Sequence, residues 1–228
     1  SILDGACRLK PLVKHVKELG QTAIAITDHG VMHGCIDFYK ACKAEDIKPI
    51  IGCEVYVAPR TRFDKVHGLD NQRYHLVLLA KNNNGYKNLI KLVSAAWTEG
   101  FYTKPRIDHD ILEQYHEDII CLSACLAGEI PRKLSASDYK GAFEKAIYYK
   151  NLFGDGNFYI ELQKHGIDDE DRVAPKLVKI ARKFDIPMVV TNDIHYVDQD
   201  DAEAQDILVC IGRKKLQSEP HGKMPGGP

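Results

Sequence analysis

The sequence predicts an α/β domain in which buried strands alternate with helices. Six short apolar runs are separated by amphipathic stretches, a pattern typical of a parallel sheet that is either open or closed into a barrel. The chain has 228 residues, which is enough for one large domain or two small ones, and we expect one. Hydrophobic residues make up 44% of the chain and charged residues 28%, so a sizeable core is expected.

The predicted strands are runs of mostly apolar residues bounded by polar or turn residues. Such runs are typical of strands that are buried on both faces of a sheet. The clearest is Tyr74-His-Leu-Val-Leu-Leu-Ala80, which is followed directly by polar residues. In chain order, the strands are expected at residues 23–27, 49–58, 74–80, 118–123, 158–162 and 188–191.

The predicted helices carry apolar residues that recur every three or four positions. The first helix stops at Gly20, because glycine readily adopts the left-handed conformation that ends a helix. In the third helix, Trp97 extends the apolar stripe of Leu89 and Val93, which favours a packing role for this side chain. In chain order, the helices are expected at residues 9–19, 34–45, 86–99, near 111, 139–152, 173–184 and 201–211.

Charge and cysteine content argue against several classes of protein. The formal net charge of −1 disfavours a domain that grips a nucleic-acid backbone by itself, although a neighbouring domain could still present DNA or RNA to it. The seven cysteines contain no Cys-x-x-Cys pair, so no zinc ribbon is predicted. Dispersed cysteines fit a reducing compartment, and no apolar run is long enough to span a membrane. We therefore expect a cytoplasmic protein.

Polar side chains suited to metal binding follow several of the predicted strands. Asp28-His29, Cys125 and Asp193-x-His195 come after three different apolar runs. In parallel α/β sheets and barrels, the loops at the carboxyl ends of the strands build the functional site. These residues are therefore the first candidates for one.

Two further candidates, Glu54 and His75, lie inside predicted strands. A buried glutamate is costly unless it is paired or bound to a metal. Each candidate alone has an ordinary explanation: Asp28 could cap a helix, Glu54 could face water on an edge strand, and Cys125 could be a small buried hydrophobe. Their recurrence on four or five strand units instead favours a preformed site with several metals. Nitrogen, oxygen and thiolate ligands suit zinc, manganese or iron better than calcium, and metals about 4 Å apart can support phosphoryl transfer.

Other residues of the same types are expected to have no role at this site. Cys121 lies within an apolar strand and is expected in the core. Four histidines fall in polar surroundings and are expected to be exposed, namely His15, His109, His116 and His165.

Around these residues the chain resembles the PHP (polymerase and histidinol phosphatase) domain family, and within it the branch found in bacterial DNA polymerase III α subunits. The similarity extends from Ser1 to about Arg213, and the segments around Tyr86 and Phe101 resemble the polymerase branch. The matching segments are Ser1-Ile-Leu-Asp-Gly5, Ile26-Thr-Asp-His-Gly30, Lys48-Pro-Ile-Ile-Gly-Cys-Glu54, Tyr74-His-Leu-Val-Leu-Leu-Ala80, Leu122-Ser-Ala-Cys-Leu-Ala-Gly-Glu129 and Thr191-Asn-Asp-Ile-His-Tyr196.

The resemblance implies a distorted (β/α)7 barrel over residues 1–212. The tail over 213–228 departs from the family pattern, and its Pro- and Gly-rich end predicts a disordered tail or linker. It also implies nine ligands for up to three divalent metals, which are zinc, manganese, iron or magnesium. Seven ligand positions are matched, by Asp4, His29, Glu54, His75, Cys125, Asp193 and His195. Glu54, Asp193 and His195 carry over as catalytic residues, and Asp28 as an orienting neighbour. The family's opening strand bears a His-x-His pair, so we expect that strand and two ligands to be missing here.

Three functions follow from the resemblance. The first is a fragment of a DNA-directed DNA polymerase, a nucleotidyltransferase, in which this domain supports hydrolysis at 3′ ends. DNA would be reached through the parent polymerase, and the partners would be a proofreading exonuclease subunit and other replisome subunits. The second is a stand-alone phosphoesterase such as histidinol-phosphate phosphatase, which the polymerase-like segments at Tyr86 and Phe101 disfavour. The third is a non-catalytic scaffold that docks the exonuclease subunit.

Overall fold

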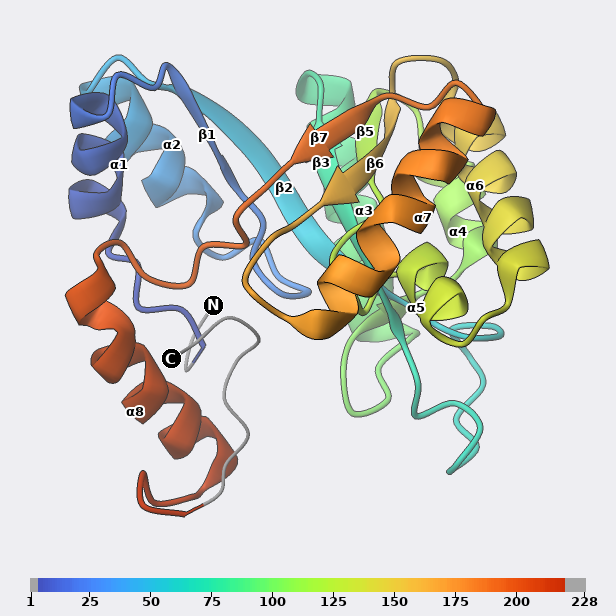
Figure 1. The fold of residues 1–228 in the computed structure, drawn as a ribbon. Helices are drawn as coiled ribbons and strands as arrows, with labels where there is room; N and C mark the ends of the chain where they lie inside the picture. The colour runs from blue at the N-terminus through green and yellow to red at the C-terminus, as the bar shows by residue number, and fades with distance from the viewer. Residues whose placement is uncertain (1–3, 220–228) are drawn as a thin grey trace.

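The computed structural model describes residues 4–219 and contains one curled mixed sheet (Figure 1). Along its hydrogen-bonded path the strand order is β1-β2-β3-β5-β6-β7, and β4 pairs with β2 outside this path. The strands are β1 (Ala23–Ile26), β2 (Lys48–Val57), β3 (Tyr74–Ala80), β4 (Arg106–Ile107), β5 (Ile119–Leu122), β6 (Phe158–Leu162) and β7 (Met188–Val190). All six predicted strands are present, and β4 was not predicted, because a two-residue strand has no periodicity to detect.

The expected parallel sheet is wrong at one strand. β3 runs antiparallel to both of its neighbours, β2 and β5, whereas every other pairing is parallel. A parallel connection needs a crossover, usually a helix, but an antiparallel partner can be reached without one. The segment 58–73 between β2 and β3 contains no helix. The polar, helix-free character of that segment was the signal for a reversed strand.

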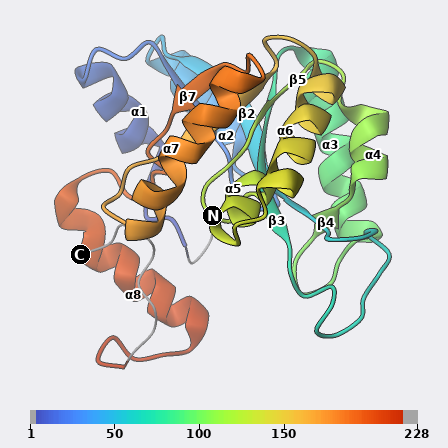
Figure 2. The same cartoon turned by 45° about the vertical axis from the view of Figure 1, so that its right-hand side comes forward.

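Helices cover the outer face of the sheet, except for α8, which lies apart from the strands (Figures 1 and 2). They are α1 (Leu9–Glu18), α2 (Cys35–Ala44), α3 (Asn83–Thr98), α4 (His109–Tyr115), α5 (Glu129–Ser135), α6 (Tyr139–Phe153), α7 (Asp168–Lys183) and α8 (Ala202–Arg213), with a short 3₁₀ helix η1 (Gln199–Asp201). α7 starts five residues before its predicted first residue. Four acidic residues fill its first turn, where negative charge is favourable. α5 was missed, because it has seven residues and contains Pro131 in its first turn.

The two faces of the strands contribute to different apolar clusters. Leu78, Cys121 and Phe158 face the helices and are almost fully buried, so the core position expected for Cys121 is confirmed. Val77 and Leu122 face the other way, into the hollow of the curl. That hollow is a cavity of about 840 Å³ with apolar walls and with polar residues at one end.

The curl does not close on itself within the described residues. β1 and β7 stand at the two ends of the strand order and do not pair with each other over residues 4–219. The prediction of a missing first strand stays a prediction. No described helix is long and apolar enough to cross a membrane. Most of the tail expected over residues 213–228 lies outside the described part of the chain, and α8 ends at Arg213.

Candidate metal centre

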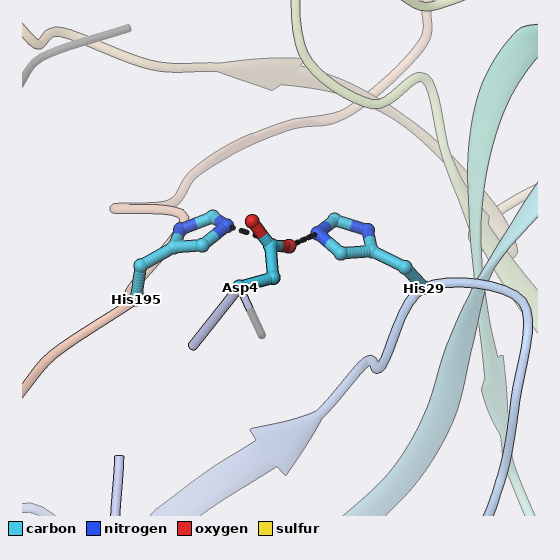
Figure 3. Close-up of side chains that lie close together, drawn as sticks. All are labelled: Asp4, His29 and His195. Carbon is cyan, nitrogen blue, oxygen red and sulfur yellow. Dashed lines mark ion pairs between the residues drawn. The ribbon is translucent and has the colours of Figure 1, made fainter. Parts of the chain in front are cut away.

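Asp4, His29 and His195 form one compact group of potential ligands (Figure 3). One carboxylate oxygen of Asp4 lies 2.6 Å from Nε2 of His29 and 3.7 Å from Nε2 of His195. All three side chains are half-buried, and their ligand atoms lie within 4.8 Å of one another. Segments from the N-terminal region, from the end of β1 and from the loop after β7 therefore meet at one point.

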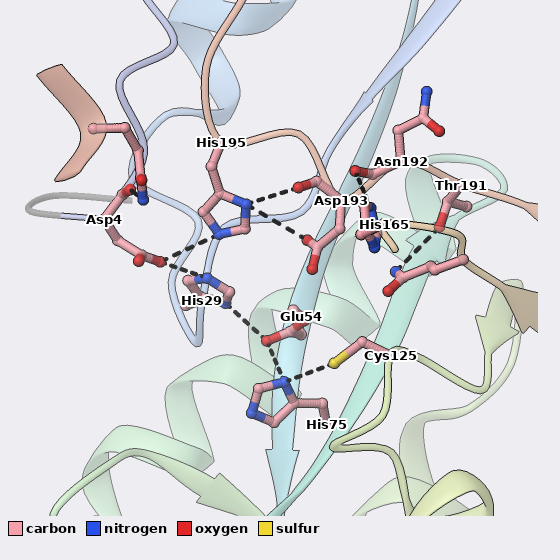
Figure 4. Close-up of polar contacts among 12 residues, drawn as sticks. Asp4, His29, Glu54, His75, Cys125, His165, Thr191, Asn192, Asp193 and His195 are labelled. Carbon is pink, nitrogen blue, oxygen red and sulfur yellow. Dashed lines mark hydrogen bonds and ion pairs between the residues drawn. The ribbon is translucent and has the colours of Figure 1, made fainter. Parts of the chain in front are cut away.

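Glu54, His75 and Cys125 form a second group beside the first (Figure 4). Oε1 of Glu54 lies 2.9 Å from Nδ1 of His75, and Sγ of Cys125 lies 3.6 Å from the same nitrogen. Glu54 is buried, with 5% of its surface exposed. This group places a buried carboxylate beside one nitrogen donor and one sulfur donor, an arrangement that a bound cation would stabilise.

His29 joins the two groups. Its Nδ1 lies 2.7 Å from Oε1 of Glu54, while its Nε2 faces Asp4. Burial alone would lower the pKa of His29, but the hydrogen bonds to Asp4 and Glu54 outweigh it and raise this pKa to about 10. Burial would likewise raise the pKa of Glu54, yet the bonds from His29 and His75 hold it at about 2. In the metal-free chain, the protonated imidazole of His29 therefore bridges the carboxylates of Asp4 and Glu54.

The reversed direction of β3 explains how His75 reaches the site. The register pairs Glu54 with Val77. His75 lies two residues before Val77, near the start of β3. The start of β3 therefore lies at the same edge of the sheet as the ends of the parallel strands. The backbone N–H of His75 donates to the carbonyl of Ala127, and this bond ties β3 to the loop that carries Cys125. A bridge between His29 and Glu54 extends the pairing of β1 and β2 up to the site.

His195 is oriented by its own loop. Its Nδ1 lies 2.7 Å from the carbonyl oxygen of Asp193, so this nitrogen donates and Nε2 is turned toward Asp4. The backbone N–H of Ala6 donates to the carbonyl of His195, and the side chain of Gln205 in α8 donates to the carbonyl of Asp4. These two bonds hold the N-terminal segment against the loop after β7.

Asp193 lies beside both groups but belongs to neither. Its side chain is exposed, and its carboxylate is 3.9 Å from Nδ1 of His195. Its backbone φ is 46°, a left-handed value that is uncommon for a residue other than glycine. Such a conformation costs free energy and persists only where neighbouring contacts impose it.

The donor set fits divalent transition metals. Two imidazoles and a carboxylate in one group, and a carboxylate, an imidazole and a thiol in the other, are ligands typical of zinc, iron and manganese sites. Burial, together with the charge of Glu54, raises the pKa of the Cys125 thiol to about 12, so a metal would have to displace its proton. One oxygen of the buried Glu161, which lines the same cavity, has no hydrogen-bond partner among the described residues. Burial, together with the charges of Asp193 and Glu54, raises the pKa of Glu161, so a cation in this cavity would favour its charged form.

The family model for the PHP domain matches residues 1–165, which is more than half of the chain. The chain belongs to the PHP domain family. The curated relatives of this PHP domain include the DNA polymerase III subunit α of Treponema pallidum, at 53% identity over 97% of this chain. The subunits of Borreliella burgdorferi and Thermus aquaticus are 48% and 44% identical over 96% of it. The chain spans about 19% of the length of the first two relatives.

Solved structures agree with the fold of this PHP domain. An amidohydrolase from Chromobacterium violaceum superposes with a TM-score of 0.53 at 13% identity, over 86% of this chain and 85% of that one. A two-domain protein from Bacteroides vulgatus that contains a predicted PHP-like metal-dependent phosphoesterase gives 0.50 at 13% identity, over 87% of this chain and 51% of that one. The mixed, curled sheet with outer helices therefore agrees with the distorted barrel that the resemblance implied.

The exposure expected for four histidines of this PHP domain is wrong, because all of them are half-buried: His15, His109, His116 and His165. His165 is half-buried, with Nδ1 2.8 Å from the buried Glu170. His109 is half-buried against Glu129, which also accepts hydrogen bonds from Tyr149 and Lys145. Their polar sequence neighbours suggested exposure, but the partners are provided by helices whose start the sequence placed late or missed. Trp97 is also more exposed than expected, at 45%, and its indole N–H donates to the carbonyl of Gly30.

Proposed function

We propose that this PHP domain binds divalent metal ions through the two groups and hydrolyses phosphodiester bonds at the 3′ ends of DNA. The observation that carries the proposal is the direct contact between the groups, 2.7 Å from His29 to Glu54. Two ligand groups that share such a contact would hold their ions close enough to act on one phosphate. Divalent ions about 4 Å apart would supply an activated water at neutral pH and would stabilise charge on the phosphoryl oxygens.

The chain's own residues have separable roles in this proposal. Asp4, His29 and His195 would hold one ion, and Glu54, His75 and Cys125 a second. To ligate, His29 must give up the proton that it holds between Asp4 and Glu54, so metal affinity should rise with pH. Asp193 stands exposed at the rim, where it can complete a metal's ligands. A third ion would need donors beyond the two groups.

The parent protein is proposed from the relatives, which are named DNA polymerase III subunit α. We infer that this chain is part of such a polymerase and that the nucleotidyl-transfer carboxylates lie outside these residues. DNA would then reach the PHP site through the polymerase, in the cytoplasm and within a replisome. A separate proofreading exonuclease subunit and other replisome subunits are the proposed partners.

A 3′-end nuclease assay tests the proposal. The purified chain is incubated with a 5′-labelled DNA strand in the presence of Mn²⁺ or Zn²⁺, and shortening from the 3′ end is followed on a gel. His195→Asn should reduce the rate by at least about tenfold, because it removes a nitrogen ligand. His67→Asn, at an exposed position in the loop after β2, should leave the rate unchanged.

Other outcomes of this assay would support the other functions. Hydrolysis of a small phosphate monoester without any action on DNA would favour a stand-alone phosphoesterase. Metal binding that raises stability without turnover of either substrate would favour a scaffold that docks the exonuclease subunit.

A further inference from the structure

His165 lies between α7 and the turn of residues 192–195, and Figure 4 shows its contact with Asn192. Its Nδ1 is 2.8 Å from Oε1 of Glu170, and its Nε2 is 2.8 Å from the backbone carbonyl oxygen of Asn192. The other carboxylate oxygen of Glu170 accepts the backbone N–H of His165 at 2.7 Å. Glu170 belongs to the first turn of α7 and is 6% exposed. The imidazole is thus fixed from behind by a buried carboxylate.

The carbonyl that His165 contacts belongs to the turn that carries two of the candidate ligands. Asn192 precedes Asp193 directly, and His195 follows two residues later. Asn192 and Asp193 are exposed, and the left-handed backbone of Asp193 costs free energy that its neighbours must offset. A carbonyl oxygen can only accept, so Nε2 of His165 carries a proton and donates to it. This bond anchors the middle of an otherwise exposed turn.

The bond also bears on the direction of His195. Nδ1 of His195 donates to the carbonyl of Asp193, so the backbone of the turn sets the direction in which Nε2 faces Asp4. A rotation of the Asn192 peptide would move the Asp193 carbonyl and turn His195 away. The neighbouring anchor, from the Thr191 hydroxyl to Glu161, holds the residue before the turn rather than the turn itself.

We propose that His165, fixed by Glu170, is a positioning residue that holds the 192–195 turn in the conformation in which His195 and Asp193 can bind metal. The inference rests on the proposed metal site and adds two residues to it, neither of which is itself a ligand. The other group, of Glu54, His75 and Cys125, receives no residue from this turn. Loss of the bond from His165 to Asn192 should therefore weaken binding of the ion held by Asp4, His29 and His195. Binding of the other ion should be unchanged.

A matched pair of variants separates the two contacts of His165. The amide nitrogen of glutamine reaches about as far as Nε2, so His165→Gln keeps the bond to Asn192. The shorter asparagine reaches about as far as Nδ1, so His165→Asn keeps the side of the ring that faces Glu170 and loses Asn192. A role in folding stability alone would not favour the glutamine variant over the asparagine variant in metal binding.

The experiment titrates Co²⁺ into the chain and follows two signals. The thiolate-to-cobalt absorption band reports the Cys125 group, and calorimetry reports the total number of sites. His165→Asn should keep the thiolate band but bind its other ion at least tenfold more weakly, whereas His165→Gln should bind both ions within about threefold of the wild type. Amide hydrogen exchange of residues 193–195 in the metal-free chain should be faster in His165→Asn only.

Two results would overturn the inference. One is that His165→Asn binds both ions as the wild type does and leaves exchange in the turn unchanged. The other is that the two variants are equally impaired, which would mean that the bond to Asn192 is irrelevant. A wild-type chain that binds no Co²⁺ at all would overturn the proposed function as well, so the two failures are distinguishable.

Discussion

Glu54 carries the buried charge that joins the two ligand groups when no metal is bound. One of its oxygens accepts hydrogen bonds from His29 at 2.7 Å and from His75 at 2.9 Å. The fall of its pKa from 4.5 to about 2 corresponds to roughly 3 kcal/mol of stability at pH 7. Breaking a buried charged pair typically costs about 3–5 kcal/mol, which is of the same order. We therefore predict that Glu54→Gln lowers the free energy of unfolding of the metal-free chain by about 3 kcal/mol.

The pH dependence of this loss follows from the signs of the two shifts. The pKa of Glu54 is lowered on folding, so its contribution is present above pH 4.5 and is lost as pH falls toward 2. The pKa of His29 is raised, so its contribution is complete below pH 6.5 and is lost as pH rises toward 10. The difference between wild type and Glu54→Gln should be largest near pH 5 to 6 and should shrink on both sides.

Urea unfolding in the presence of a chelator, followed by circular dichroism at several pH values, measures this difference. Glu144→Gln is the matched control, because Glu144 is exposed and forms a weak i,i+4 ion pair with Lys140 at 3.8 Å. It should cost less than about 0.5 kcal/mol. Equal stability of the two variants at pH 7 would refute the argument that the buried network stabilises the metal-free chain.

Three further perturbations probe the same site. Cys125→Ser should remove the thiolate absorption band of the Co²⁺-loaded chain and leave one ion bound; a persisting band would contradict the assignment of the sulfur ligand. Trp97→Phe removes the indole N–H that donates to the carbonyl oxygen of Gly30 at 2.8 Å, next to His29. It should lower the free energy of unfolding, measured by urea unfolding, by about 1 kcal/mol. An unchanged value would argue against this bond. Gly128→Ala would place a Cβ 2.1 Å from the carbonyl oxygen of Ser123 in the Cys125 loop, and should cost about 1–3 kcal/mol. Wild-type stability would show that the loop can relax.

Much of this fold could be predicted, because the central strands β2, β3, β5 and β6 are largely buried and therefore appear as apolar runs. The direction of β3 could not be read from its own residues, which look like those of any buried strand. The information lay in the segment before it, which has no helix to cross the sheet. α5 and β4 were missed because seven and two residues are too few to show a period.

His29, Cys125, Asp193 and His195 could be predicted from their positions after apolar runs, and Asp4 only from the family resemblance. The grouping of the candidate ligands could not be predicted. Asp4 and His195 are far apart in the sequence, and their proximity depends on the N-terminal segment crossing to the loop after β7. His75 looked like a mid-strand residue until the reversal of β3 placed it at the site edge. The supporting role of His165 was hidden because its partner Glu170 lies in a helical turn that the apolar period did not reach.

Metal content is the measurement that tests the central claim most directly. The chain is purified, loaded with Zn²⁺ or Mn²⁺, freed of unbound metal and analysed for elemental composition, with circular dichroism to verify that it is folded. The two ligand groups predict at least two ions per chain, one of which is lost in His195→Asn and the other in Cys125→Ser. A folded chain that retains no metal would contradict the claim, and would leave these side chains as a hydrogen-bonded network that serves the fold alone.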